Sequence, residues 1–149
     1  MQITPAKASD IPALCELLGI LFSQEADFNP DFNAQSRGLA RIIGNPDVGL
    51  ILVARRDAQV VGMVSLLYTI STALGARVAL LEDMVISPGM RGSGVGSRLL
   101  EQAIQTARSS GCKRITLLTD HDNESAQRFY QRHGFTFSAM IPLRLSLGE

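Results

Sequence analysis

The stretch from Glu82 to Gly96 contains residue types that can bind an anion and accept a proton. Two adjacent carboxylates, Glu82 and Asp83, lie in an otherwise apolar run, and the glycine-rich residues 91–96 follow a Ser-Pro-Gly turn. A strand that leads through glycines into a helix presents free backbone N–H groups and the positive end of a helix dipole to an anion. Glycines also let the backbone approach a pyrophosphate closely. The stretch therefore predicts a phosphate-binding loop beside a candidate general base.

Two common phosphate-binding patterns do not fit this loop. A dinucleotide fingerprint would need glycine where the chain has Ser97, and a P-loop needs a Gly-Lys pair, which the sequence lacks. The pattern that fits is Arg/Gln-x-x-Gly-x-Gly/Ala, with Arg91, Gly94 and Gly96. Two alternatives stay open on the loop alone: a tight turn without a ligand, and a site for another nucleotide, which the failure of both fingerprints disfavours.

A second block of spaced residues follows the loop along the chain. It reads Asn-x-x-Ala-x-x-Phe-Tyr-x-x-x-Gly-Phe and consists of Asn123, Ala126, Phe129, Tyr130, Gly134 and Phe135. Together with the loop and the opening residues 6–14, this block resembles the GNAT family of N-acetyltransferases over nearly the whole chain. The resemblance implies acetyl-CoA as co-substrate, with its pyrophosphate on the glycine-rich loop. The cofactor-binding residues that we expect are Met84, Val85, Ile86, Arg91, Gly92, Ser93, Gly94, Val95, Gly96, Ser97 and Asn123.

Glu82 is the expected catalytic base. Amide formation from an ammonium and a thioester needs a proton acceptor, and an acid in an apolar strand is costly unless it is paired or functional. The order Leu-Glu-Asp before the loop resembles the diamine and polyamine acetyltransferase branch, where a glutamate serves as base. We expect a buried carboxylate that acts directly or through one water, on the sheet face opposite Asp83. The structural alternative is a salt bridge to an arginine such as Arg77.

Tyr130 is the expected acid that protonates the departing thiolate. The resemblance places a tyrosine of this block near the cofactor sulfur, whereas helical spacing with Ala126 and Phe129 also allows a packing role. Polarisation of the carbonyl is expected from a backbone N–H within residues 84–86, the strand segment with which pantetheine pairs in the family. Asn123 either contacts the cofactor or caps its helix.

Hydrophobic periodicity predicts the elements that position these residues. The expected strands are 2–5, 49–54, 60–70, 77–86, 115–119, 135–138 and 141–146, and the expected helices are 11–22, 34–43, 95–110 and 123–133. This order indicates a mixed α/β fold in a single domain over residues 1–149. The resemblance implies a mainly antiparallel sheet of six to seven strands, about four helices and a splayed central parallel pair.

Composition gives no indication of a nucleic-acid or membrane partner. The 14 basic and 14 acidic residues balance, which disfavours nucleic-acid or membrane binding, and the pair Arg55-Arg56 is explained as a solvated strand end. Cys15 and Cys112 lie far apart without metal-like spacing, and the sequence places no further ligand at metal-site spacing from His121 or His133, so we expect free buried thiols and no metal. The polar N-terminus lacks a signal-peptide pattern. These features predict a cytoplasmic protein.

The sequence therefore predicts an acetyl-CoA-dependent N-acetyltransferase that acts by direct transfer in a ternary complex. No base neighbours either cysteine in sequence, which disfavours an acetyl-cysteine intermediate. The alternative is an acyl-CoA-binding sensor of the same fold without useful turnover. A small-molecule or peptide amine is the expected acceptor, and residues 23–33 and 70–77 are expected to shape the pocket that binds it. The acids Glu25, Asp27 and Asp31 fit a cationic substrate only weakly, and the resemblance is compatible with a homodimer.

Overall fold

The computed structural model describes residues 1–24 and 31–148, which fall into two compact units, Met1–Leu118 and Thr119–Glu149. Within these described ranges, no helix has both the length and the apolar character needed to cross a membrane. The acids Glu25 and Asp27, expected to shape an acceptor pocket, lie outside the described residues. The expectation of a single domain stays a prediction.

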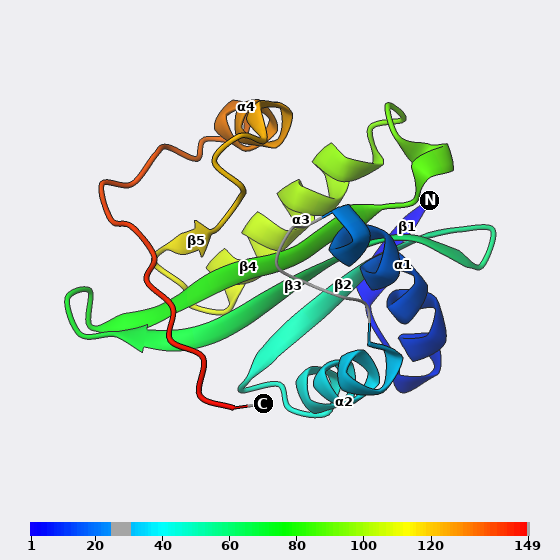
Figure 1. The fold of residues 1–149 in the computed structure, drawn as a ribbon, viewed down its shortest axis with the longest axis horizontal. Coiled ribbons are helices and arrows are strands. Elements are labelled where there is room, and N and C mark those ends of the chain that lie inside the picture. The colour runs from blue at the N-terminus through cyan, green and yellow to red at the C-terminus, as the bar shows by residue number, and fades with distance from the viewer. Residues whose placement is uncertain (25–30, 149) are drawn as a thin grey trace. The chain divides into compact units, whose positions relative to one another are not determined.

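The first unit is built on a five-stranded sheet in the order β1-β2-β3-β4-β5 (Figure 1). The strands are β1 (Gln2–Pro5), β2 (Gly49–Arg56), β3 (Gln59–Ser71), β4 (Ala76–Ile86) and β5 (Ile115–Leu117). The first four pair antiparallel, and β5 runs parallel to β4. Asp57 and Ala58, both with positive φ, close the β2–β3 hairpin in the conformation that matches strand twist. The predicted mixed, mainly antiparallel sheet with one parallel pair is confirmed.

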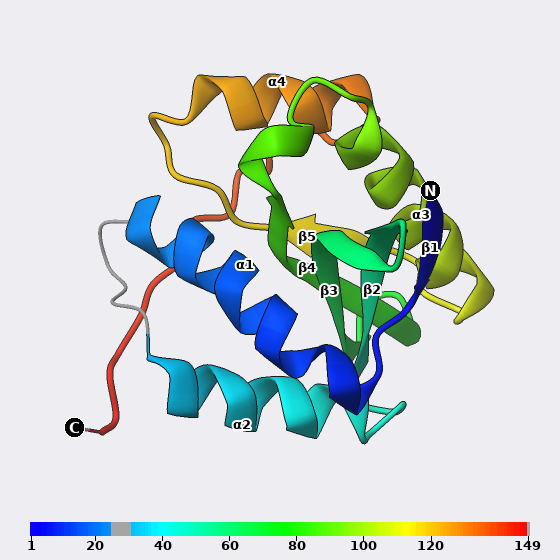
Figure 2. The same cartoon turned by 90° about the vertical axis from the view of Figure 1, so that its right-hand side faces the viewer.

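Helices cover both faces of this sheet. The helices α1 (Ile11–Gln24) and α2 (Phe32–Ile43) lie on one face, and α3 (Val95–Ser109) lies on the other (Figure 2). Alternation along β3 explains the division, because Met63 belongs to the core cluster with Leu14 of α1, whereas its neighbour Gly62 lies under Leu99 of α3. The face toward α1 and α2 is called the α1–α2 face below.

The second unit contains one helix, α4 (Glu124–Arg132), and no strand among its described residues. The predicted strands 135–138 and 141–146 are therefore wrong, and the sheet has five strands instead of six to seven. The segment does alternate: Ile141, Leu143, Leu145 and Leu147 are apolar, but each is at least 80% exposed. Alternation shows which residues could share a face, but a strand also needs a partner edge, which local sequence does not supply.

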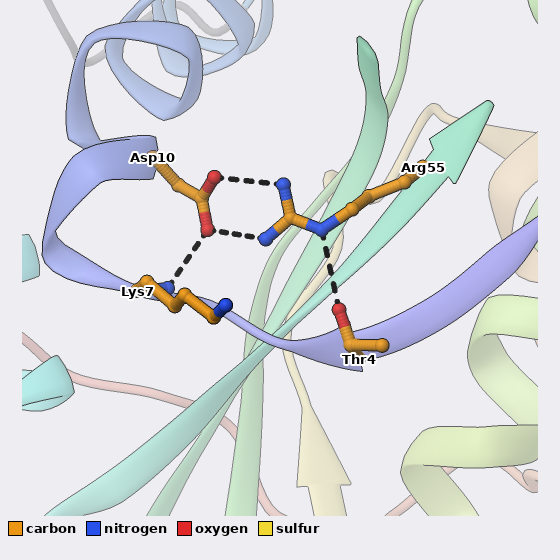
Figure 3. Close-up of polar contacts among 4 residues, drawn as sticks. All are labelled: Thr4, Lys7, Asp10 and Arg55. Atoms are coloured by element: carbon orange, nitrogen blue, oxygen red, sulfur yellow. Dashed lines mark hydrogen bonds and ion pairs between the residues drawn. The ribbon is translucent and has the colours of Figure 1, made fainter. Parts of the chain in front are cut away.

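A partly buried cluster around the ion pair of Asp10 and Arg55 joins β1, the 3-10 turn Ala8–Asp10 before α1, and β2 (Figure 3). Two guanidinium nitrogens of Arg55 donate to the two carboxylate oxygens of Asp10 at 2.8 and 2.5 Å, and Arg55 Nε donates to Thr4 Oγ1 at 3.3 Å. Asp10 also accepts from the backbone N–H of Lys7 at 2.8 Å. The Arg55 hydrogen bonds hold the pKa of Asp10 below its ordinary value, against the opposing effect of burial. The expectation that Arg55 is a solvated strand end is wrong, because Asp10 approaches it from a distant part of the chain.

We predict that Asp10→Ala lowers the free energy of unfolding by about 2–4 kcal/mol, because Arg55 would keep a partly buried charge without its partner. The control is Asp47→Ala, whose carboxylate is fully exposed and lies 4.0 Å from Arg77, and it should change stability little. Because the folded pKa of Asp10 is lowered, its stabilisation is present above about pH 4 and is lost as pH falls through the folded value. Urea unfolding at neutral and acidic pH measures both effects. Equal losses in the two variants would contradict the prediction.

Candidate active site

Strand β4 has a partner on both edges only along its first half. Its parallel pairing with β5 covers Ala79, Leu80 and Leu81, whereas β4 itself continues to Ile86. Among the described residues, 82–86 therefore have β3 on one edge and no strand on the other. Their backbone groups on that edge need partners, and an extended ligand with amide groups can supply them. This short parallel pairing agrees with the expected splay.

A β-bulge interrupts β4 within this half-paired segment. The register pairs Ser65 with Glu82 and Met63 with Val85, so two residues of β4 face one residue of β3. Asp83, the first residue of the bulge, has φ 54°, in the left-handed region that non-glycine residues rarely adopt. Side chains do not alternate strictly between the two sheet faces across a bulge. Alternation therefore no longer supports the prediction that Glu82 and Asp83 lie on opposite faces of the sheet.

Glu82 is exposed, so the predicted burial of its side chain is wrong. Glu82 directly follows Leu81, the last residue of β4 that pairs with β5. The apolar neighbours of Glu82 in the sequence do not indicate that the pairing ends there. The alternative salt bridge to Arg77 is not formed either. Arg77 lies 4.5 Å from the ring centre of Tyr68 and 4.0 Å from a carboxylate oxygen of Asp47. Among the described residues, no ion pair occupies the Glu82 carboxylate.

The glycine-rich loop has the conformation and the open space that a phosphate needs. Gly92 and Gly94 have φ 79° and 86°, and a Cβ atom built on either would meet no heavy atom within 4 Å. Gly94 is the N-cap of α3, and its carbonyl accepts the first helical hydrogen bond, from Arg98 N–H at 3.2 Å. N–H groups in the first turn of a helix have no helical acceptor, which makes this end an anion site. The loop therefore fits a pyrophosphate.

Basic side chains accompany this loop from two parts of the chain. Arg91, which the sequence predicted, is exposed. Arg56, at the end of β2, reaches Met90 of the loop with its Nη1 atom 3.7 Å from the sulfur. The role of Arg56 was not predictable from the sequence, because nothing local to β2 indicates that the end of this strand lies beside a loop 34 residues away.

Tyr130 and Asn123 belong to the second unit, whereas Glu82, β4 and the glycine-rich loop belong to the first. The Asn123 side chain accepts from Ala126 N–H at 3.1 Å, so it caps α4. The Tyr130 ring forms edge contacts with Phe129 and Phe135 at 5.3 and 5.7 Å between centres. Burial raises the pKa of Tyr130 to about 12, so its hydroxyl is protonated at neutral pH. Both residues have the packing or capping contacts named as their structural alternatives.

The structure also describes Asp31, the two cysteines and the side chains that could bind a metal. The Asp31 carboxylate accepts from Ala34 N–H at 3.1 Å and caps α2, which accounts for it without a substrate. Cys15 and Cys112 are free and buried. In the described parts of the chain, His, Cys, Asp and Glu side chains form no group of three that could hold a metal ion.

Comparisons with known proteins connect this geometry to a family. The profile of the acetyltransferase (GNAT) family matches residues 13–135. An uncharacterized N-acetyltransferase of Bacillus subtilis is 31% identical, over 91% of this chain and 89% of that protein. The aminoalkylphosphonate N-acetyltransferase of Salmonella typhimurium is also 31% identical, over 90% and 84%. Among solved structures, an integron cassette protein from the Cole Harbour Salt Marsh metagenome matches with TM-score 0.86 and 26% identity, over 99% and 91%.

The environment of Tyr130 predicts that one tyrosine ionises late. Because burial raises the pKa of Tyr130 from 10.0 to about 12, an ultraviolet titration of tyrosinate should show a step near pH 12. That step should be missing from Tyr130→Phe. The raised folded pKa also means that the stability contributed by the neutral hydroxyl is complete below about pH 10 and is lost as pH rises through about 12. A late step that persists in the variant would show that Tyr130 is not the tyrosine that ionises late.

Proposed function

Because the chain belongs to the acetyltransferase (GNAT) family, we propose that it transfers an acetyl group from acetyl-CoA to a primary amine by direct attack in a ternary complex. The observation that supports this most is the continuity of one segment. The half-paired edge of β4 leads within a few residues to the glycine-rich N-terminus of α3. An extended arm with amides that ends in a pyrophosphate matches this order of binding groups, and acetyl-CoA has that composition.

The proposed donor contacts follow the order of the segment. Backbone groups of Met84, Val85 and Ile86 pair with the pantetheine arm, and one of their N–H groups polarises the thioester carbonyl. The pyrophosphate binds at residues 91–97, where the open sites of Gly92 and Gly94 admit it. Asn123 is proposed as a further contact through its amide nitrogen, because its oxygen already caps α4.

Glu82 and Tyr130 are proposed to move the protons. The acceptor ammonium gives one proton to Glu82, which is exposed and can pass it to solvent. The amine nitrogen then attacks the carbonyl carbon, so that a C–N bond forms as the C–S bond breaks. Tyr130 protonates the departing sulfur and regains a proton as the nitrogen loses its second one. The products are the acetamide and CoA thiol, with one proton released.

The acceptor is proposed to be a small amine. The Salmonella typhimurium relative is named for aminoalkylphosphonates, so these compounds head a panel that continues with diamines, polyamines, aminoglycosides and peptides. CoA release with any amine of the panel supports the enzyme. If acetyl-CoA binds but no amine causes release, the chain is an acyl-CoA sensor and the proposed activity is wrong.

We also propose a cytoplasmic location and a homodimer. The free, buried thiols of Cys15 and Cys112 are typical of a reducing compartment, which supports a cytoplasmic location. The proposal of a homodimer depends on the resemblance to the family.

We predict that acetyl-CoA raises the melting temperature of the wild type and that Gly94→Val abolishes this shift. A side chain at Gly94 would occupy the open space in front of the loop. The matched control is Gly111→Val, because Gly111 has the same φ of 86° and the same open surroundings at the other end of α3. Both variants carry the same backbone strain, so only loss of the ligand-induced shift in Gly94→Val indicates a binding site. An equal shift in both variants would place the phosphates elsewhere.

We also predict that Glu82→Gln keeps acetyl-CoA affinity but lowers turnover by about a hundred- to ten-thousand-fold at neutral pH. The loss should shrink as pH rises, because free amine then needs no base. Steady-state rates of CoA release across pH measure it, with the exposed Glu101→Gln of α3 as a control. A pH–rate profile equal to that of the wild type would remove Glu82 from the mechanism.

In the same assay, Tyr130→Phe should lower turnover and leave acetyl-CoA binding unchanged.

A further inference from the structure

Ser65, in the middle of β3, has a fully buried hydroxyl without a hydrogen-bond partner in the part of the chain that the structure describes. Its exposed fraction is 0%, and the neighbours along the strand, Val64 and Leu66, are buried and apolar. Among the described residues, the other buried side-chain atom without a partner is Nε2 of Gln35, in a residue that is only partly buried. An unpaired buried hydroxyl destabilises the fold, so its partner in the working protein needs to be identified.

The register places Ser65 beside the proposed base. Ser65 pairs with Glu82 across the β3–β4 ladder, and this is the last regular pair before the bulge. Residues directly opposite in an antiparallel pair lie on the same sheet face, with Cβ atoms about 4.5–5.5 Å apart. A glutamate side chain is long enough to bring its carboxylate within hydrogen-bond distance of a hydroxyl at that separation.

The face on which the two residues lie is also defined. Ser65 pairs on its other side with Ile51 of β2, which belongs to the core cluster of the α1–α2 face. Ser65 is therefore the buried, polar member of a cross-strand row that runs from the apolar Ile51 to the exposed Glu82. In the structure, the carboxylate and the hydroxyl are adjacent in register but not hydrogen-bonded to each other.

We propose that Ser65 is a positioning residue whose hydroxyl donates a hydrogen bond to the Glu82 carboxylate when an acceptor amine covers it. This inference rests on the proposed role of Glu82 as base. The exposed carboxylate is hydrated before the acceptor binds, and it loses water when the amine approaches. A hydroxyl already held on the same face replaces one of those water contacts and directs the carboxylate toward the α1–α2 face. In this proposal, the Ser65 hydroxyl has no partner in the ligand-free protein and bonds to Glu82 only while the acceptor is bound.

The test compares activity with stability in Ser65→Ala. Loss of a hydrogen bond to a charged group should lower kcat about ten- to a hundred-fold and leave KM for acetyl-CoA unchanged. The melting temperature of the ligand-free protein should stay equal or rise, because the variant removes an unpaired buried hydroxyl. Acetyl-CoA and an aminoalkylphosphonate serve as substrates, and the fastest amine of the panel replaces the latter if it reacts better.

Ser71→Ala is the matched control on the same strand. Ser71 is also buried, at 8% exposure, but its hydroxyl accepts from Leu74 N–H at 3.1 Å. This variant should lose stability, the reverse of the unchanged or raised melting temperature expected for Ser65→Ala. If Ser65→Ala loses stability and activity together, Ser65 is a structural residue and the proposal is wrong.

A double-mutant cycle separates this proposal from the proposed function. Ser65→Ala should lower kcat in the wild-type background but not in Glu82→Gln, because the carboxylate that it positions is then absent. Equal losses in both backgrounds, or wild-type turnover in Ser65→Ala, would overturn the positioning role and leave Glu82 as base. Wild-type turnover in Glu82→Gln would instead overturn the base itself. Ser65→Cys, which keeps nearly the same volume but has a weaker donor, should also lose turnover and gives a second test of the donated hydrogen bond.

Discussion

Among the described residues, no strand pairs with β4 beyond Leu81 on the side of β5, and the proposed donor site depends on this unpaired edge. A continuous parallel pair would satisfy the backbone groups of residues 82–86 within the sheet and leave none for a ligand. Because the pairing stops after three residue pairs, the strand enters the glycine-rich loop with one edge available. The open edge is short and contains a bulge, two features that limit unwanted strand pairing.

Two unfavourable features coincide at the same step of the β3–β4 ladder. Asp83 adopts a left-handed conformation, and Ser65, one residue from the bulge along β3, carries a buried hydroxyl without a partner. Each costs stability, and such costs concentrate at functional sites, where the surrounding structure maintains them. Both adjoin Glu82, which supports the view that this part of the sheet is shaped for chemistry as well as for packing.

The remainder of the first unit maintains that geometry. The core cluster of α1, α2 and the sheet holds Met63 and Val85, the pair on the far side of the bulge, while α3 packs on the opposite face. The Asp10–Arg55 pair joins the turn that precedes α1 to β2 through side chains that are mostly buried. Together these contacts hold β4 and its bulge between two helical layers.

Sequence alone determined the features that depend on local pattern. The glycines of residues 91–96 predict a turn that leads directly into a helix, and the apolar stripe of 95–110 predicts the helix itself, because both depend on steric and periodic rules within a few residues. Tertiary structure decided the rest. The exposure of Glu82, the pairing of Arg55 with Asp10 and the contact of Arg56 with the loop each depend on segments that meet only after folding. The unformed strands 135–138 and 141–146 show the same limit, because alternation assigns a face but cannot supply the edge with which a strand must pair.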